Sequence, residues 1–129
     1  MDDERMEAAG AAHLPAGALP VNGAIEATAV EVLLEPLPQE QTVAGHPEAG
    51  AGELGSFRGA QLGVWEMTEG TATDVEADEV FIVVVGRAVI DFLDEDRSIE
   101  VGPGSIVRLA AGARTRWTVT ERLRKVYLA

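Results

Sequence analysis

The 129-residue sequence contains no cysteine, which excludes disulfide bonds, thiolate catalysis, zinc ribbons and iron–sulfur clusters. It also lacks any apolar run near the ~20 residues that cross a bilayer, so we expect no membrane span. Basic residues are scarce, because 22 acidic against 10 basic side chains give a formal net charge of −12. Such a chain repels phosphate, so neither nucleic acid nor an anionic membrane is expected as a partner. The acidic N-terminus has no apolar signal region, and a cytoplasmic protein is expected.

Aromatic side chains are missing from residues 1–52, which hold five of the six prolines and both histidines. All six aromatic residues lie in 53–129. A segment without aromatic residues builds a core with difficulty, so the folded body is placed at 53–129. Residues 1–27 are interpreted as a flexible or extended arm. Residues 28–52 are interpreted as a strand at 28–34, which is β-branched and alternating, followed by a linker rich in glycine and proline.

The second half alternates short apolar or β-branched runs with turns. These runs cover 62–67, 79–85, 88–93, 98–101, 105–109, 114–119 and 123–128. The spacing of these seven short runs is typical of strands, and no apolar period of 3.6 residues follows residue 53. The sequence therefore predicts an all-β sandwich or barrel.

Two blocks of the sequence are punctuated by glycine. Glu79 is followed by six residues and then Gly86, and Gly102-Pro103-Gly104 is followed by Ala110-Ala111-Gly112. These blocks resemble the two motifs of the cupin superfamily of small jelly-roll barrels, with Ala110-Ala111-Gly112 at the place where that family usually has Pro-x-Gly. Segments 64–70 and 114–129 look more specifically like the single-domain cupins related to ureidoglycine aminohydrolase and to the ethanolamine-utilisation cupin. The resemblance covers roughly 60–129. It implies a cupin-type jelly-roll β-barrel, here with an extended N-terminal arm.

Typical cupins hold a divalent metal with three histidines and one glutamate inside the barrel, and this sequence departs from that pattern. The histidine positions of the family fall within 72–75 and at Thr115, and none of them is a histidine here. The only histidines, His13 and His46, lie in the first half. One carboxylate does not hold a transition metal, so we expect no metal and no cofactor. The acidic run before Glu79 is interpreted as a solvated loop, with an all-oxygen site as the alternative: Asp74, Glu76 and Asp78.

If Glu79 faces the barrel interior, as the resemblance implies, period-two alternation carries other side chains inward with it. The alternation groups Phe81, Val83 and Val85; Thr115, Trp117 and Val119; Leu123, Lys125 and Tyr127; and Trp65 and Met67. The predicted ligand-binding residues are Trp65, Glu79, Phe81, Thr115, Trp117 and Tyr127, and the candidate catalytic residues are Glu79, Lys125 and Tyr127. An aromatic pocket with a few polar groups is typical of a small-molecule site. The alternatives are two core tryptophans, a tyrosine plug and a basic rim that includes the lysine.

Three functions follow from this set of residues. The first is metal-free binding of a small polar or carbonyl-bearing metabolite in the barrel. The second is an isomerase, hydrolase or lyase that uses Glu79 as general acid and base, with Lys125 or Tyr127 as its partner. The third is a structural or partner-binding barrel whose interior is filled.

Charge of opposite sign is separated along the body. Residues 66–100 hold eleven acids and two bases, whereas 108–129 hold six bases and one acid. These two groups meet either within the fold or across a dimer. Because cupins often exchange N-terminal strands between subunits, the isolated strand at 28–34 favours a homodimer with strand exchange.

Overall fold

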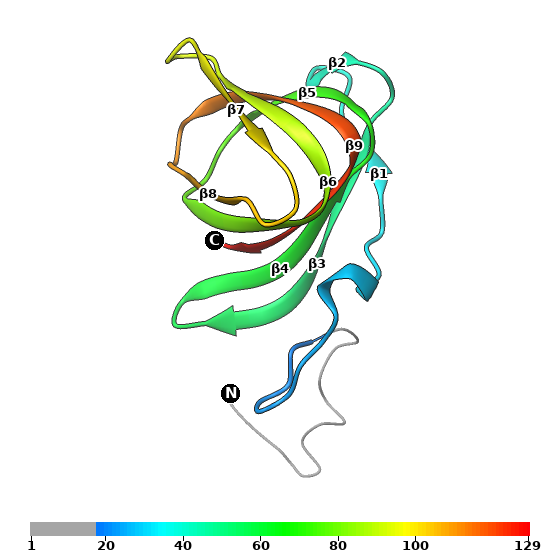
Figure 1. Ribbon diagram of the computed structural model, residues 1–129, viewed down its shortest axis with the longest axis vertical. Coiled ribbons are helices and arrows are strands. Elements are labelled where there is room, and N and C mark those ends of the chain that lie inside the picture. The colour runs from blue at the N-terminus through cyan, green and yellow to red at the C-terminus, as the bar shows by residue number, and fades with distance from the viewer. Residues whose placement is uncertain (1–17) are drawn as a thin grey trace.

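The computed structural model describes residues 18–129, most of which lie in β-strands (Figure 1). His13 and most of the predicted arm at 1–27 lie outside the described residues. One short 3₁₀ helix, η2, spans Ala27–Ala29. The strands are β1 (Glu35–Pro36), β2 (Thr42–Ala44), β3 (Glu48–Phe57), β4 (Ala60–Met67), β5 (Gly70–Val75), β6 (Glu79–Phe92), β7 (Arg97–Val101), β8 (Ile106–Leu109) and β9 (Arg114–Leu128).

The sheet is antiparallel throughout, and β9 is its central strand. β9 pairs with β4, β5 and β6, and β6 pairs on its other side with β8 and then β7. Figure 1 shows the sheet curled into a barrel, with the β3–β4 hairpin extending beyond it. The prediction of an all-β barrel is confirmed. Within residues 18–129, no helix is long and apolar enough to cross a membrane.

Two pairs of predicted strands are in fact continuous. Runs 79–85 and 88–93 form the single strand β6, and runs 114–119 and 123–128 form β9. Gly86 was expected to end a strand, but its φ of +90° instead accommodates a shift of register inside β6. A β-carbon at Gly86 would collide with the Arg122 backbone across the pair, so only glycine permits this close approach.

The register shift corrects the expected orientation of one residue. Phe81 and Val83 point into the core and are almost fully buried, whereas Val85 is 41% exposed. Alternation holds only while the pairing is regular, and the pairing of β6 with β9 shifts between Val83 and Val85.

The predicted strand at 28–34 is wrong. Apart from η2, this segment has no regular structure, and strand pairing begins only at Glu35, which lies opposite Ala49 of the same chain. The reason is a side-chain partner: Arg124 Nη1 donates to the carbonyl oxygens of Ala27 at 2.8 Å and Val30 at 2.6 Å. These carbonyls are satisfied by a guanidinium, so they require no neighbouring strand.

The segment expected to be a linker contains β2 and the first half of β3. β3 pairs with β4 along its length, and β2 pairs with β5. Gly50 and Gly52, two of the glycines that suggested a linker, lie on the outer face of β3 where residues 30–33 pack closely against it. Small residues are needed where backbone lies against backbone, so here they mark close packing rather than flexibility.

The separated charges meet within one chain. On β9, Arg114 forms an ion pair with Asp94, and Arg116 forms one with Asp91. Glu66 of β4 forms ion pairs with both Arg122 and Arg124. Acidic and basic residues of the two regions therefore form ion pairs within one chain.

Candidate functional site

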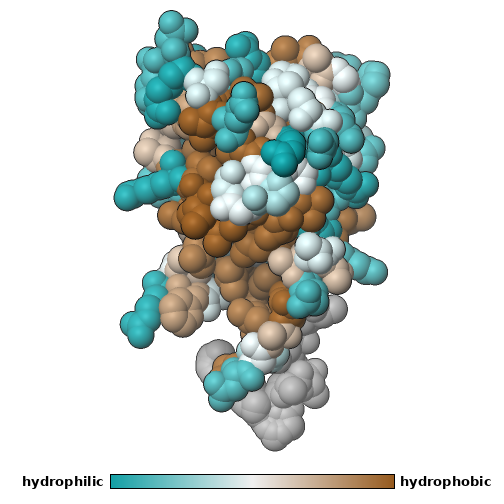
Figure 2. Space-filling model, viewed as in Figure 1, coloured by the Kyte–Doolittle hydropathy of each residue, from teal (hydrophilic) through white to brown (hydrophobic). Residues whose placement is uncertain are grey.

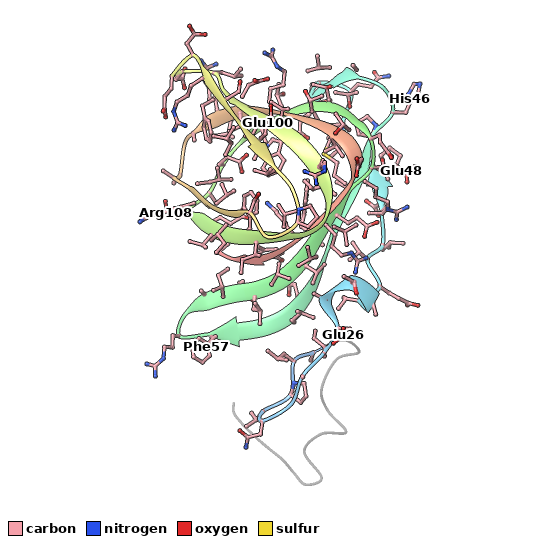
Figure 3. All side chains as sticks on the ribbon, viewed as in Figure 1. Glu26, His46, Glu48, Phe57, Glu100 and Arg108 are labelled. Carbon is pink, nitrogen blue, oxygen red and sulfur yellow. The ribbon has the colours of Figure 1, made fainter. Side chains whose placement is uncertain are left out.

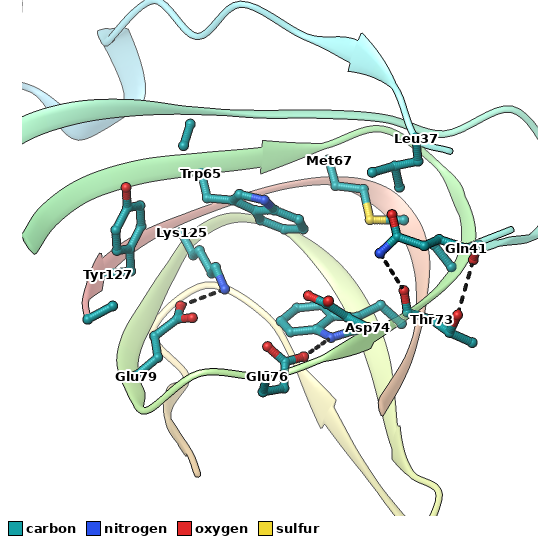
Figure 4. Close-up of a pocket in the computed structure, with 14 residues that line it drawn as sticks. Leu37, Gln41, Trp65, Met67, Thr73, Asp74, Glu76, Glu79, Lys125 and Tyr127 are labelled. Carbon is teal, nitrogen blue, oxygen red and sulfur yellow. Dashed lines mark hydrogen bonds and ion pairs between the residues drawn. The ribbon is translucent and has the colours of Figure 1, made fainter. Parts of the chain in front are cut away.

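A cavity of about 250 Å³ opens among β3, β4, β5 and β9, with Glu76 from the turn between β5 and β6 and Glu79 from the start of β6 in its lining (Figure 4). Its lining consists of Leu37, Gln41, Ala51, Trp65, Met67, Ala72, Thr73, Asp74, Glu76, Glu79, Trp117, Lys125, Tyr127 and Ala129. Both tryptophans of the chain and its only lysine are among these residues.

Lys125 is held in an aromatic cage. Its Nζ lies 4.2 Å from the ring centroid of Phe81, 4.7 Å from that of Trp65 and 4.9 Å from that of Trp117. The Lys125 side chain is only 6% exposed. Each ring face attracts a cation, and the attraction grows as water is removed, so the three rings stabilise the buried ammonium.

Glu79 supplies the opposite charge. Its Oε2 lies 2.7 Å from Lys125 Nζ, and the Glu79 side chain is 13% exposed. The contact is an ion pair without hydrogen-bond alignment, because this buried Oε2 accepts no hydrogen bond from the described residues. The lysine and the carboxylate thus neutralise each other at the cavity wall, while hydrogen-bonding capacity remains unused there.

Glu76 forms a second anchored carboxylate. It is 8% exposed, and its Oε2 accepts hydrogen bonds from Thr115 Oγ1 at 2.6 Å and Trp117 Nε1 at 2.9 Å. These two donors fix both the carboxylate and the indole ring that forms part of the cage. The expected solvated acidic loop is therefore wrong for Glu76.

The two other acids of this run differ from Glu76. Asp74 ends at the exposed rim of the cavity, where partial burial and then Glu76 raise the pKa of its carboxyl. Asp78 is exposed and outside the cavity, and it accepts a hydrogen bond from the Ala111 backbone N–H.

Tyr127 closes the cavity on the side of the C-terminus. Burial, and after it the charges of Glu53 and Glu79, raise the pKa of its phenol above the ordinary value of 10. The hydroxyl therefore keeps its proton at neutral pH and is available as a donor.

Most of the residues expected to form a site are brought together. Trp65, Glu79, Trp117, Lys125 and Tyr127 line the cavity. Phe81 and Thr115 lie behind its wall: Phe81 is 1% exposed beneath Lys125, and Thr115 is fully buried against Glu76.

Among the lining residues that the sequence analysis missed, two are polar: Gln41 and Thr73. Gln41 was assigned to the linker, and its amide nitrogen donates to the Thr73 carbonyl oxygen at 3.4 Å. Thr73 belongs to β5, a strand that was not predicted. The signal that could have found this strand is the β-branched residue at every second position: Thr71, Thr73 and Val75. Nothing in the sequence around Gln41 indicates its position.

The residues present do not fit the metal site that the cupin pattern implies. No three histidine, cysteine, aspartate or glutamate side chains within residues 18–129 form a group that could hold a metal ion. His46 lies exposed on the outside of the molecule (Figure 3). The ammonium of Lys125 sits against the one carboxylate, Glu79, that the family would offer to the ion.

The comparisons with known proteins agree with this architecture. Residues 54–127 match the family model described as the EutQ-like cupin domain. A search of curated proteins found no match.

Solved structures show the same fold. The EutQ protein of Clostridium difficile is 17% identical, with a TM-score of 0.61, over 81% of this chain and 83% of its own. A DUF861-family protein of unknown function from Pseudomonas syringae pv. tomato is 22% identical, with a TM-score of 0.63, over 78% of this chain but only 44% of its own. A protein of unknown function from Rhizobium leguminosarum is 22% identical, with a TM-score of 0.56, over 62% of this chain and 78% of its own. Identities this low establish the fold alone.

The expectation of a cupin-type barrel is thereby confirmed, because the family model covers more than half of the chain and the structural neighbours share the curled sheet. The chain belongs to the family of EutQ-like cupin domains.

Proposed function

We propose that this chain binds a small polar metabolite in the barrel cavity and does so without a transition metal. The observation that carries the proposal is the caged Lys125–Glu79 ion pair in the wall of an open cavity. Burying two charges in an aromatic environment costs free energy, and a filled structural core would use apolar side chains there. Polar groups fixed in an aromatic cavity are what a ligand site requires.

The same pair supports the proposed absence of a metal. A divalent ion beside Glu79 would meet the ammonium of Lys125, and like charges at that distance repel strongly in a partly buried site. The ammonium itself supplies the positive charge that balances Glu79.

The test is a panel of small polar metabolites added to purified protein, followed by the indole N–H signals of the two tryptophans in NMR spectra. Both tryptophans line the cavity, so a cavity ligand must shift at least one signal. We expect at least one metabolite to give a saturable shift, without any requirement for added metal.

A pair of variants makes this test specific to the cavity. Tyr127→Phe removes a hydroxyl from the cavity and should weaken binding, whereas Thr118→Val removes a hydroxyl from the opposite face of β9 and should not. A panel without any saturable shift, or binding that requires stoichiometric metal, would contradict the proposal. The first of these results would favour a structural or partner-binding barrel.

A second candidate, an enzyme of the isomerase, hydrolase or lyase class, is favoured by the same 2.7 Å pair. Glu79 would act as general base, and Lys125 and the protonated Tyr127 would act as donors to the substrate. If a metabolite from the panel is turned over, Glu79→Gln must abolish the turnover while the metabolite still binds.

A further inference from the structure

The charges that line the cavity are unbalanced. Asp74, Glu76 and Glu79 contribute three carboxylates, and Lys125 is the only cationic side chain among the described lining residues. Lys125 is already paired with Glu79 and surrounded by three rings. The charges of Asp74 and Glu76 therefore have no cationic partner in the cavity.

In each of these two acids, one carboxylate oxygen accepts no hydrogen bond from the described residues. Glu76 is more than nine-tenths buried, and only its Oε2 accepts hydrogen bonds, from Thr115 and Trp117. Among residues 18–129 no donor reaches its Oε1. Asp74 uses Oδ1 for the Val75 backbone N–H at 2.8 Å, and its other oxygen is unbonded. Carboxylate oxygens without a donor in the lining of a cavity favour a ligand that donates hydrogen bonds.

The two acids act on the same part of the cavity. Figure 4 shows Asp74 and Glu76 on one side, with Lys125 and Glu79 on the other and Trp65 above them. The second indole, that of Trp117, is fixed by Glu76 itself and lies 5.6 Å from the Trp65 ring, centroid to centroid. Both indole rings already contact the Lys125 ammonium, so the two acids, and not the rings, favour a cationic ligand.

We propose that the ligand is a small organic cation, whose positively charged nitrogen is bound by Asp74 and Glu76, and that a carboxylate of the same shape is rejected. This inference rests on the proposed binding function and adds the chemical class of the ligand. An amidinium or a primary ammonium has the required charge and several N–H donors, whereas a carboxylate has neither.

Three probes of the same shape separate charge from size: propionamidinium, propionamide and propionate. They are titrated against the two indole N–H signals of the wild-type protein. We expect a saturable shift with propionamidinium, at least about tenfold weaker binding of propionamide, and no saturable shift with propionate. Equal or tighter binding of propionate or propionamide would overturn the inference while leaving cavity binding intact. The inference would also be overturned if none of the three probes shifted an indole N–H signal. The proposed binding function would then be tested separately by the metabolite panel.

Two matched variants locate the effect. Asp74→Asn keeps the side-chain shape at the cavity rim and should remove most of the roughly tenfold preference for the amidinium over the amide. Asp78→Asn makes the same change of charge outside the cavity, with its contact to the Ala111 N–H preserved, and should leave the preference unchanged. An equal loss in both variants would show that net charge rather than the cavity selects the cation, and would contradict the inference.

Discussion

Lysine occurs once in this chain, at position 125, while the other nine basic residues are arginines. The arginines among residues 18–129 lie outside the cavity, where several form ion pairs with carboxylates on the sheet surface. A compact ammonium fits between three ring faces, whereas a planar guanidinium is larger and needs a wider set of acceptors. The choice of lysine at this position is therefore explained by the shape of the cage.

The cage predicts strong coupling between Lys125 and Glu79. Lys125→Met leaves a carboxylate nearly buried without its partner and should lower the free energy of unfolding by about 3–5 kcal/mol. Glu79→Gln leaves the ammonium without its anion and should also destabilise. In the double variant, the loss in free energy of unfolding should be smaller than the sum of the two single losses, because no unpaired charge then remains buried. Urea denaturation of the four proteins measures this coupling.

An exposed ion pair serves as the control for this cycle. Arg97 and Glu95 also lie 2.7 Å apart, but their side chains are 54% and 55% exposed. Arg97→Met should therefore cost less than about 1 kcal/mol. Additive effects at Lys125 and Glu79 would show that the pair contributes no more than a surface contact.

Asp74 predicts a dependence of stability on pH. Burial, and then Glu76, raise its pKa above the ordinary 3.8, so the folded protein holds this proton more tightly than the unfolded chain. Proton binding by Asp74 therefore adds to the free energy of unfolding. The full addition is present below pH 3.8, and it is lost as the pH rises through the folded-state pKa of Asp74. At pH 7, Asp74→Asn should raise the free energy of unfolding by less than about 1 kcal/mol, since solvent screens a rim carboxylate.

The gain from Asp74→Asn should vanish in urea titrations below pH 3.8, where the wild-type carboxyl is already protonated. A gain of the same size at pH 3 and pH 7 would contradict the assigned cause. Asp78→Asn again provides the exposed control.

At the scale of elements, the N-terminal segment is held against β3 by glycine. A β-carbon at Gly50 would collide with the Leu33 carbonyl oxygen, whereas one at Gly52 would make ordinary van der Waals contacts. Gly50→Ala should therefore displace residues 30–34, with faster amide hydrogen exchange there and a loss of about 1–3 kcal/mol. Gly52→Ala is the matched control, and similar exchange in the two variants would show that the close approach at Gly50 is not needed.

The sequence predicted the elements well where burial alone decides them. The β-branched runs of β6 and β9 read correctly as strands, and period-two alternation placed Trp117, Lys125 and Tyr127 on one inner face. The prediction of a strand end at Gly86 was wrong. A glycine that shifts the register inside a strand cannot be distinguished in sequence from one that ends a strand.

Residues whose environment depends on distant partners could not be predicted. Glu76 stands in an acidic run typical of a solvated loop, and only its contacts with Thr115 and Trp117, about forty residues later, bury it. Residues 28–34 alternate as a strand does, but their partners are the Arg124 guanidinium and a glycine-lined face. The sequence pattern around Glu76 or around residues 28–34 does not indicate these contacts with distant residues.

At the scale of the whole molecule, the predicted homodimer with strand exchange is open to a direct test. The opposite charges that suggested a dimer are paired within one chain. The remaining support is an apolar area on the outer face of β6, β8 and β9, where Figure 2 shows hydrophobic surface. It includes Val80, Ile82, Ile106 and Leu128, which are between 41% and 72% exposed.

If a second copy covers this area, light scattering should give twice the mass of one chain, and Ile82→Glu should reduce it to the mass of the monomer. Val43→Glu places the same charge on an exposed residue of β2 and should leave the dimer intact. A monomeric wild-type protein at micromolar concentration would show that the chain functions alone.

The position of β9 has a consequence for biosynthesis. β9 is a hydrogen-bonded neighbour of three strands, β4, β5 and β6. It is nevertheless the last strand of the fold to leave the ribosome. Until Arg114–Leu128 emerges, the nascent chain exposes the edges of three strands, with no closed barrel to hide them. Formation of the barrel, and with it the aromatic cage around Lys125, is therefore a late and cooperative event. A nascent chain arrested before this strand is a natural substrate for chaperones.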